Sequence, residues 1–182
     1  MGDYEDFIRE NWLGRRTADC IGLLKGYAWL DTTDMTIGYA ENGAPDYGAN
    51  QMYQYVKESG TAGEDYGGMA SLPEIPGLML WKEGHAGVYI GGGLAVECSP
   101  AFENDVQITA VKNMGTKSGY NARTWTKHGK LPYIEYDNAA PVQPDKPDTG
   151  AGAGGAIKAG SVVRVKQGAK TYTGGGLASF VY

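Results

Sequence analysis

The spacing of apolar residues changes along the chain, and this change predicts helices first and strands afterwards. From residue 17 onward, apolar residues recur at intervals of three and four, which is the spacing of one helix face. The residues on that face are Ile21, Leu24 and Ala28. We expect Thr17 to cap this helix and Asp19 to lie in its first turn, where a carboxylate favours the helix dipole. A second helix is expected over 50–58.

Beyond residue 77 the period shortens, and apolar runs alternate with turn-forming residues. The expected strands are 78–81, 86–90, 94–98, 106–111 and 131–136. Helices followed by an antiparallel meander are typical of an α+β fold. The sequence therefore predicts a helix packed against an antiparallel sheet.

A change of composition divides the chain into three parts. Residues 1–138 hold the regular apolar patterns and are expected to form the main domain. Residues 139–156 contain three prolines and then alternate Gly with Ala, which is typical of a linker. Residues 157–182 alternate short apolar runs with a Gly-rich turn. This stretch is too short for its own core and predicts the start of a truncated β module.

Three glycines at 91–93 separate two of the expected strands and determine how these strands pair. With a three-residue loop, one face of the hairpin is wholly apolar, whereas a two-residue loop moves Glu97 onto that face. The apolar face then comprises Ala86, Val88, Ile90, Leu94, Val96 and Cys98. His85 and Glu97 share the opposite face as diagonal neighbours, and Gly87 leaves room beside Glu97. Cys98 is expected to point into the core as a structural thiol.

A nucleophilic thiol is the chemistry that these positions favour. Cys20 lies near the start of the first helix, where the helix dipole favours a thiolate, although a buried structural cysteine fits the same pattern. The chain has only two histidines. His85 can serve as the base, with Glu97 orienting it as in a catalytic triad, or Glu97 can be an ordinary solvated acid. His128, in a turn-like setting between lysines, and the segment around Trp125 are interpreted as structural, with the lysines solvated.

Charge and composition narrow the classes of partner. The net charge is −5, which argues against nucleic acid as the main partner. No run approaches the ~18 consecutive apolar residues that a membrane span needs. The acidic N-terminus lacks the apolar core of a signal peptide, so we expect export without a classical signal, or loss of one. The two histidines and scattered acids show no metal-ligand spacing, and no metal or cofactor is expected.

Three motifs, in order, resemble those of one family. Ala-Asp-Cys-Ile-Gly-Leu at 18–23 resembles the nucleophile motif of the NlpC-type cysteine peptidases. Gly-His-Ala-Gly-Val-Tyr-Ile-Gly at 84–91 resembles their histidine motif, and 94–100 resembles the following strand, which carries the third polar residue. Two positions depart from the family: Ile21 stands where Ser is usual, and Glu97 where His, Asn, Asp or Gln is commoner.

The resemblance covers roughly residues 10–136 and implies a papain-like α+β fold. It implies that Cys20, His85 and Glu97 form the catalytic triad. Asp19 would bind a substrate amine, although a helix-start acid is an equally good interpretation. No cofactor is implied. The segment before Cys20 is short, so part of the substrate cleft on that side is expected to be missing or supplied otherwise.

The resemblance also implies an activity and a partner. The expected activity is cleavage of peptidoglycan stem peptides, often between D-glutamate and the diamino acid, at the bacterial cell wall. The resemblance further implies that residues 157–182 begin a cell-wall-binding module. Because no signal peptide is present, a phage-encoded enzyme released at lysis is expected. Three alternatives stay open: an amidase that cuts between the sugar and L-alanine, an inactive wall-binding or phage structural protein, and a thiol acyltransferase.

Overall fold

The computed structural model describes residues 17–136, together with Asp6, Arg9–Glu10 and Arg164–Val165. The predicted linker at 139–156 and most of the expected module at 157–182 lie outside the described residues. Within that module, the strand β11 (Arg164–Val165) pairs antiparallel with β10 (Ile134–Glu135). Among the described residues, no helix combines the length and the apolar character needed to cross a bilayer.

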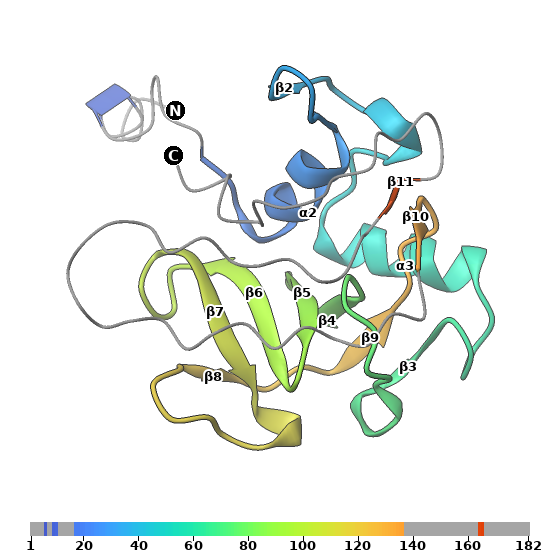
Figure 1. The fold of residues 1–182 in the computed structure, drawn as a ribbon, viewed down its shortest axis with the longest axis vertical. Coiled ribbons are helices and arrows are strands. Elements are labelled where there is room, and N and C mark those ends of the chain that lie inside the picture. The colour runs from blue at the N-terminus through green and yellow to red at the C-terminus, as the bar shows by residue number, and fades with distance from the viewer. Residues whose placement is uncertain (1–5, 7–8, 11–16, 137–163, 166–182) are drawn as a thin grey trace.

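Residues 17–136 fold as α+β, with two α-helices and a mixed seven-stranded sheet in the order β3-β9-β4-β5-β6-β7-β8 (Figure 1). The strands are β3 (Tyr66–Gly68), β4 (Met79–Lys82), β5 (His85–Gly91), β6 (Leu94–Ser99), β7 (Asp105–Val111), β8 (Ala122–Arg123) and β9 (Lys127–Gly129). A separate pair joins β1 (Leu30–Asp31) to β2 (Thr36–Ile37). Short 3₁₀ turns occur at η2 (Glu41–Gly43), η3 (Met69–Ser71) and η4 (Lys112–Met114).

The predicted antiparallel meander holds for β4 to β7, but the sheet as a whole departs from it. β7 and β8 pair in parallel, so the sheet is mixed. β9 inserts between β3 and β4 and pairs with both, although its sequence, Lys-His-Gly, carries no strand pattern. The strand predicted over 131–136 is limited to β10, which belongs to another pair. A three-residue strand held by backbone bonds on both sides needs no apolar alternation.

The helix α2 (Cys20–Ala28) begins two residues later than a cap at Thr17 would place it. Its N-cap is Asp19, whose Oδ1 accepts a hydrogen bond from the backbone N–H of Gly22 at 2.6 Å. The prediction that Thr17 caps this helix was wrong, because the carboxylate that reaches the open N–H group belongs to Asp19. Gly22 leaves space for this cap: a Cβ there would lie 2.8 Å from Asp19 Oδ1. The second helix, α3 (Ala49–Ser59), matches its prediction within one residue.

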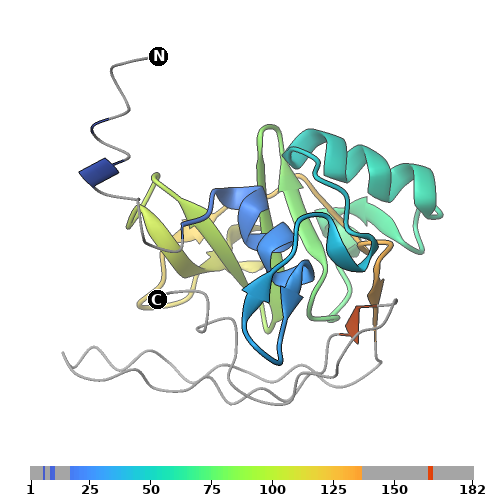
Figure 2. The ribbon, with the colours of Figure 1, turned by 90° about the horizontal axis from the view of Figure 1, so that it is seen from above.

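Both faces of the sheet are buried. α2 and α3 cover one face and share an apolar cluster with it (Figures 1 and 2). A second buried cluster lies apart from the first and comprises Leu78, Leu80, Tyr89, Ala95, Val111 and Trp125. Glu97, on the face of Tyr89 and Ala95, is 0% exposed, so the alternative that it is a solvated acid on an open sheet is wrong.

The hairpin between β5 and β6 reaches the predicted register by a different turn. Val88 faces Val96 as predicted, but the loop has two residues, Gly92 and Gly93, instead of three. The register shifts between Tyr89 and Gly91, and this irregularity absorbs the extra residue. The two loop glycines have φ angles of 59° and 73°, which a side chain would strain. The shift leaves Glu97 on the face of His85.

A buried hydroxyl holds this turn and gives a test of it. Tyr89 Oη donates to Glu74 Oε1 at 2.6 Å and accepts from the backbone N–H of Gly93 at 3.1 Å. Tyr89→Phe is expected to lower the free energy of unfolding by about 1–3 kcal/mol, because the buried N–H of Gly93 then loses its acceptor. Urea unfolding measures the change. Tyr39→Phe, which removes one bond to Asp46 from a 74% exposed ring, should change it much less; equal losses would contradict this account.

Candidate active site

Cys20 is the first residue of α2, and α2 packs against β5 and β6. Its thiol is half-buried and forms hydrogen bonds with the side chain of His85 and with the backbone of Ala86. Both partners begin β5, so the start of the helix and the start of the strand meet at the sulfur. A thiol in this position lies in the field of the helix N-terminus.

His85 connects the thiol to a buried acid. Its Nε2 lies 2.8 Å from Glu97 Oε2, and its side chain is 14% exposed. The other ring nitrogen, Nδ1, is therefore the one available to Cys20. The structure thus brings Cys20, His85 and Glu97 into one hydrogen-bonded chain. The predicted proximity of His85 and Glu97 is confirmed, whereas their catalytic roles stay predictions.

Glu97 has three side-chain donors around its carboxylate. Thr109 Oγ1 donates to Oε1 at 2.7 Å, while His85 and Arg123 Nε both donate to Oε2. Arg123 also donates from Nη2 to Ser99 Oγ at 2.9 Å. The buried charge is therefore paired and fully hydrogen-bonded, which is the condition for keeping a carboxylate ionised in the interior.

Trp125 stacks on the imidazole. The rings of His85 and Trp125 are 5.4 Å apart and inclined by 10°. Asn113 holds the Trp125 backbone from both sides, accepting from its N–H at 2.8 Å and donating to its carbonyl at 3.1 Å. A Cβ at Gly87 would lie 2.7 Å from the Trp125 ring, so Gly87 makes room for the indole. The sequence predicted that this glycine makes room beside Glu97; the nearest side chain is Trp125 instead.

The pKa shifts of the three groups all follow from these contacts. Burial raises the pKa of Cys20, but the hydrogen bonds with His85 and Ala86 outweigh it, and the pKa falls below the usual range of a thiol. Burial lowers the pKa of His85, and the bonds to Cys20 and Glu97 outweigh it, so the pKa is raised. Burial raises the pKa of Glu97, yet the donors around it produce a net decrease. The shifts at Cys20 and His85 are both in the direction that stabilises a thiolate and an imidazolium.

The other thiol behaves differently. Cys98 lies partly buried beside the apolar cluster under α2, and its Sγ donates to the carbonyl of Ala18 at 3.0 Å. Burial and the nearby carboxylates of Asp105 and Asp19 raise the pKa of this thiol. Cys98 therefore packs on the face that was predicted for it, and its environment favours the neutral thiol.

The structure gives Asp19 a definite local role, the capping of α2. Its predicted contact with a substrate amine stays a prediction. His128 is buried in β9, not in a turn, and its Nε2 lies 3.2 Å from Ser71 Oγ. Lys127 is exposed as predicted, but Lys130 pairs with Asp65 at 2.9 Å instead of being solvated.

Sequence reasoning missed three residues of this site: Thr109, Arg123 and Trp125. The alternation of β7 could have found Thr109, because this strand pairs Ala95 with Thr109 and so places Thr109 on the face of Glu97. Arg123 and Trp125 follow a long connection after β7, and no local period places them. Trp125 was interpreted as structural only, whereas it lies against His85.

Among the described residues, no three His, Cys, Asp or Glu side chains gather as a metal ion requires. Comparisons of the chain with protein-family models, with curated proteins and with solved structures find no match.

The two thiols provide an internal test of this electrostatic arrangement. A lowered pKa means a larger thiolate fraction at a given pH, and a raised pKa means a smaller one. In the folded chain at pH 6–7, iodoacetamide should modify Cys20 faster than Cys98, and the Cys20 rate should level off at a lower pH. Peptide mass spectrometry separates the two sites. Equal rates, or faster modification of Cys98, would show that His85 does not activate Cys20.

A double-mutant cycle tests the buried pair of Glu97 and Arg123. Either Glu97→Gln or Arg123→Gln alone should reduce the free energy of unfolding by about 3–5 kcal/mol, because each leaves a charge buried without its partner. Making both changes should recover part of the loss, with a coupling of at least about 1 kcal/mol. Urea unfolding measures all four proteins. The more exposed pair of Lys25 and Asp46 is the control and should couple much more weakly; additive losses at Glu97 and Arg123 would refute the pairing.

Proposed function

We propose that this protein is a cysteine peptidase that cleaves peptidoglycan stem peptides with Cys20 as nucleophile. The observation that supports the proposal is the hydrogen-bonded chain from Cys20 through His85 to Glu97, placed at the start of a helix. A helix that bears the thiol and packs on a sheet that bears the histidine is also what a papain-like fold requires. The substrate class follows from the resemblance of the motifs around Cys20 and His85 to NlpC-type peptidases.

In the proposed reaction, the Cys20 thiolate attacks the carbonyl carbon of the scissile amide. A sulfur–carbon bond forms, and the carbonyl oxygen takes up negative charge. The backbone N–H of Cys20, at the positive end of α2, is a suitable donor to this oxyanion. Imidazolium His85 then gives its proton to the leaving nitrogen as the carbon–nitrogen bond breaks.

A water molecule completes the cycle. Neutral His85 takes one proton from the water as its oxygen attacks the thioester carbon. The sulfur leaves as thiolate, the peptide product carries a new carboxyl group, and His85 is again an imidazolium. The starting ion pair is therefore restored, and no further reactant is needed.

The residues around the histidine have positioning roles in this scheme. Glu97 accepts from Nε2 and so keeps Nδ1 directed at the sulfur. Arg123 and Thr109 keep the Glu97 carboxylate ionised and oriented. Trp125 covers one face of the imidazole and excludes water from the His85–Glu97 bond.

The proposed bond is the one between D-glutamate and the diamino acid, and the proposed place of action is the bacterial cell wall after release at lysis. An amidase that cuts between the sugar and L-alanine would use the same triad, because the shape of the substrate cleft selects the bond. A thiol acyltransferase would share the first half of the reaction and replace water by an amine.

Mass spectrometry of digested peptidoglycan tests the proposal. Wild type should release fragments with a new D-glutamate carboxyl and a free diamino-acid amine. Cys20→Ala should lower the rate by more than about a thousandfold, because it removes the nucleophile, while the thermal melt stays nearly unchanged. Cys98→Ala is the matched control and should retain activity.

The other outcomes are equally distinct. New L-alanine amines with a bare lactyl group would replace the endopeptidase proposal by the amidase. Retained turnover in Cys20→Ala would exclude Cys20 as the nucleophile. Digests that match buffer across several wall types would favour an inactive wall-binding protein.

A further inference from the structure

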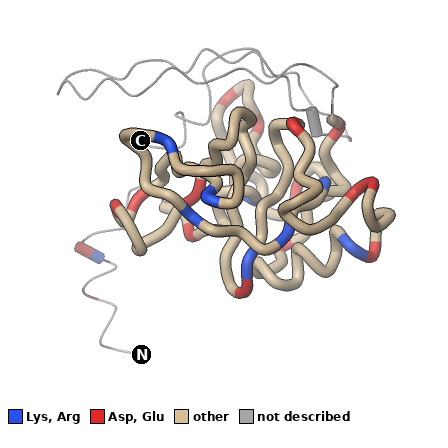
Figure 3. Tube along the Cα trace, turned by 90° about the horizontal axis from the view of Figure 1, so that it is seen from below, with Lys and Arg blue, Asp and Glu red and all other residues tan. Residues whose placement is uncertain are grey.

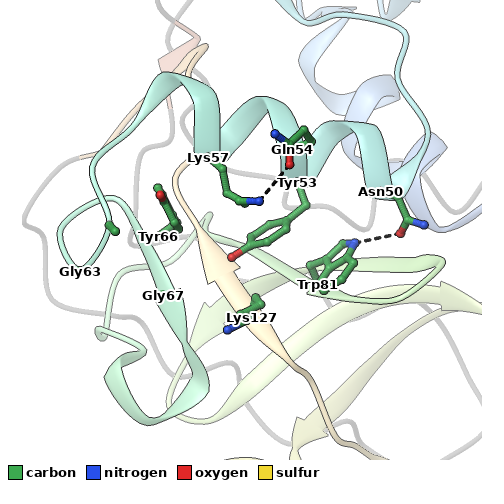
Figure 4. A pocket seen from close by; sticks show the side chains of 10 residues that line it. Asn50, Tyr53, Gln54, Lys57, Gly63, Tyr66, Gly67, Trp81 and Lys127 are labelled. Atoms are coloured by element: carbon green, nitrogen blue, oxygen red, sulfur yellow. Dashed lines mark hydrogen bonds between the residues drawn. The ribbon is translucent and has the colours of Figure 1, made fainter.

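A pocket with a volume of about 570 Å³ lies between α3 and the strands β3, β9 and β4 (Figure 4). None of Cys20, His85 and Glu97 lines it. It is therefore distinct from the proposed catalytic chain, and its lining indicates what it would bind.

One wall of the pocket is aromatic and rigidly held. The rings of Tyr53 and Trp81 stack at 4.8 Å with an angle of 13° between them. Trp81 Nε1 donates to Asn50 Oδ1 at 3.1 Å, which fixes the indole against α3. Tyr66 lies on the other side of the pocket (Figure 4). Aromatic faces held in this way offer apolar contact to the carbon skeleton of a ligand.

The charged residues that line the pocket are both basic. Lys57 from α3 and Lys127 from β9 are the charged residues that line the pocket, and no carboxylate does (Figure 4). This contrasts with the net charge of −5 and with the interspersed acidic and basic residues along the described chain (Figure 3). Lys57 Nζ donates to Gln54 Oε1 at 3.0 Å, a neutral acceptor that leaves its charge uncompensated.

Acids close in sequence to lining residues, among them Glu58, Glu64 and Asp65, do not themselves line the pocket. Asp65 pairs with Lys130 at 2.9 Å, outside the lining. Glu58 accepts from Gln54 at 2.8 Å. Glu83 accepts from Asn50 at 2.6 Å. Within the described residues, neither lining lysine forms an ion pair, so the pocket keeps two positive charges beside an aromatic wall.

Buried His128 stabilises the opposite wall. Its Nε2 lies 3.2 Å from Ser71 Oγ, and it pairs with Gly67 of β3 in the sheet. A Cβ at Gly67 would lie 2.6 Å from Ser71 Oγ and 3.2 Å from His128 Nε2. The close approach of β3 to β9 therefore depends on a glycine and a histidine that the proposed reaction does not use.

The pairing of β4 with β5 connects the pocket to the proposed nucleophile. Trp81, which lines it, pairs with Ala86 across β4 and β5, and Ala86 is the residue whose backbone bonds the Cys20 sulfur. A peptide with its scissile bond at Cys20 can therefore extend over Trp81 toward Lys57 and Lys127.

We propose that this pocket binds the carboxylate-bearing end of the peptide substrate, with Lys57 and Lys127 contacting the carboxylate and Tyr53 and Trp81 contacting the adjoining carbon chain. The inference that the ligand is a peptide rests on the proposed function. The inference that the ligand is negatively charged rests only on the residues that line the pocket. The pocket thus selects peptides with free carboxylates over amidated ones.

Binding is measured first, by calorimetry with the full chain carrying Cys20→Ala, so that no cleavage follows. The probes are the synthetic tripeptide L-alanyl-D-glutamyl-diaminopimelate and the same peptide with its carboxyl groups amidated. Adding Lys57→Gln and Lys127→Gln should weaken binding of the acidic peptide about tenfold and leave the amidated peptide unaffected. Lys112→Gln, which removes the same charge from an exposed turn, is the matched control and should change neither.

Kinetics with Cys20 intact separates this proposal from the proposed function. The Lys57→Gln/Lys127→Gln variant should raise KM about tenfold with kcat nearly unchanged, and iodoacetamide should modify Cys20 at the wild-type rate. Equal binding of the acidic and amidated peptides, or an unchanged affinity in the lysine variant, would overturn the pocket proposal even if cleavage occurs. Charge-dependent binding without any cleavage would support the pocket and remove the proposed function.

Discussion

The buried carboxylate of Glu97 is the constraint on which the rest of the site depends. A wholly buried charge is costly unless it is paired and hydrogen-bonded. Its three donors come from three different strands: His85 from β5, Thr109 from β7 and Arg123 from β8. The geometry of the site therefore requires that these strands keep their order around β6. A displacement of any of them would leave a charge without a partner.

The same carboxylate determines how the two thiols differ. Glu97 holds the His85 ring, and the ring holds the sulfur of Cys20, whose position is set by the cap of Asp19 on α2. Cys98 follows Glu97 in β6, but its side chain points to the opposite face, where no imidazole reaches it. Neighbouring positions in β6 therefore place Glu97 in the hydrogen-bond network of the candidate nucleophile and Cys98 in the apolar packing on the other face.

The two buried faces of the sheet carry different groups of residues. On one face, Trp125 covers His85 because Gly87 leaves space for the indole. On the helix side, Trp81 stacks on Tyr53 beside a pocket that carries two lysines. The first arrangement places an indole on one face of the imidazole, and the second gathers the two positive charges that we propose bind a carboxylate. β4 and β5 connect the two through the pairing of Trp81 with Ala86.

The sequence by itself determined what depends on local periodicity. Side chains alternate in strands and recur every 3.6 residues in helices. This periodicity predicted a helix around Cys20, the facing of Val88 and Val96, and the shared face of His85 and Glu97. Only the tertiary structure decided the two-residue turn, the insertion of β9, and the placement of Arg123 and Trp125. These depend on chain segments far apart in sequence, brought together by burial of Glu97 and by backbone pairing that no local pattern encodes.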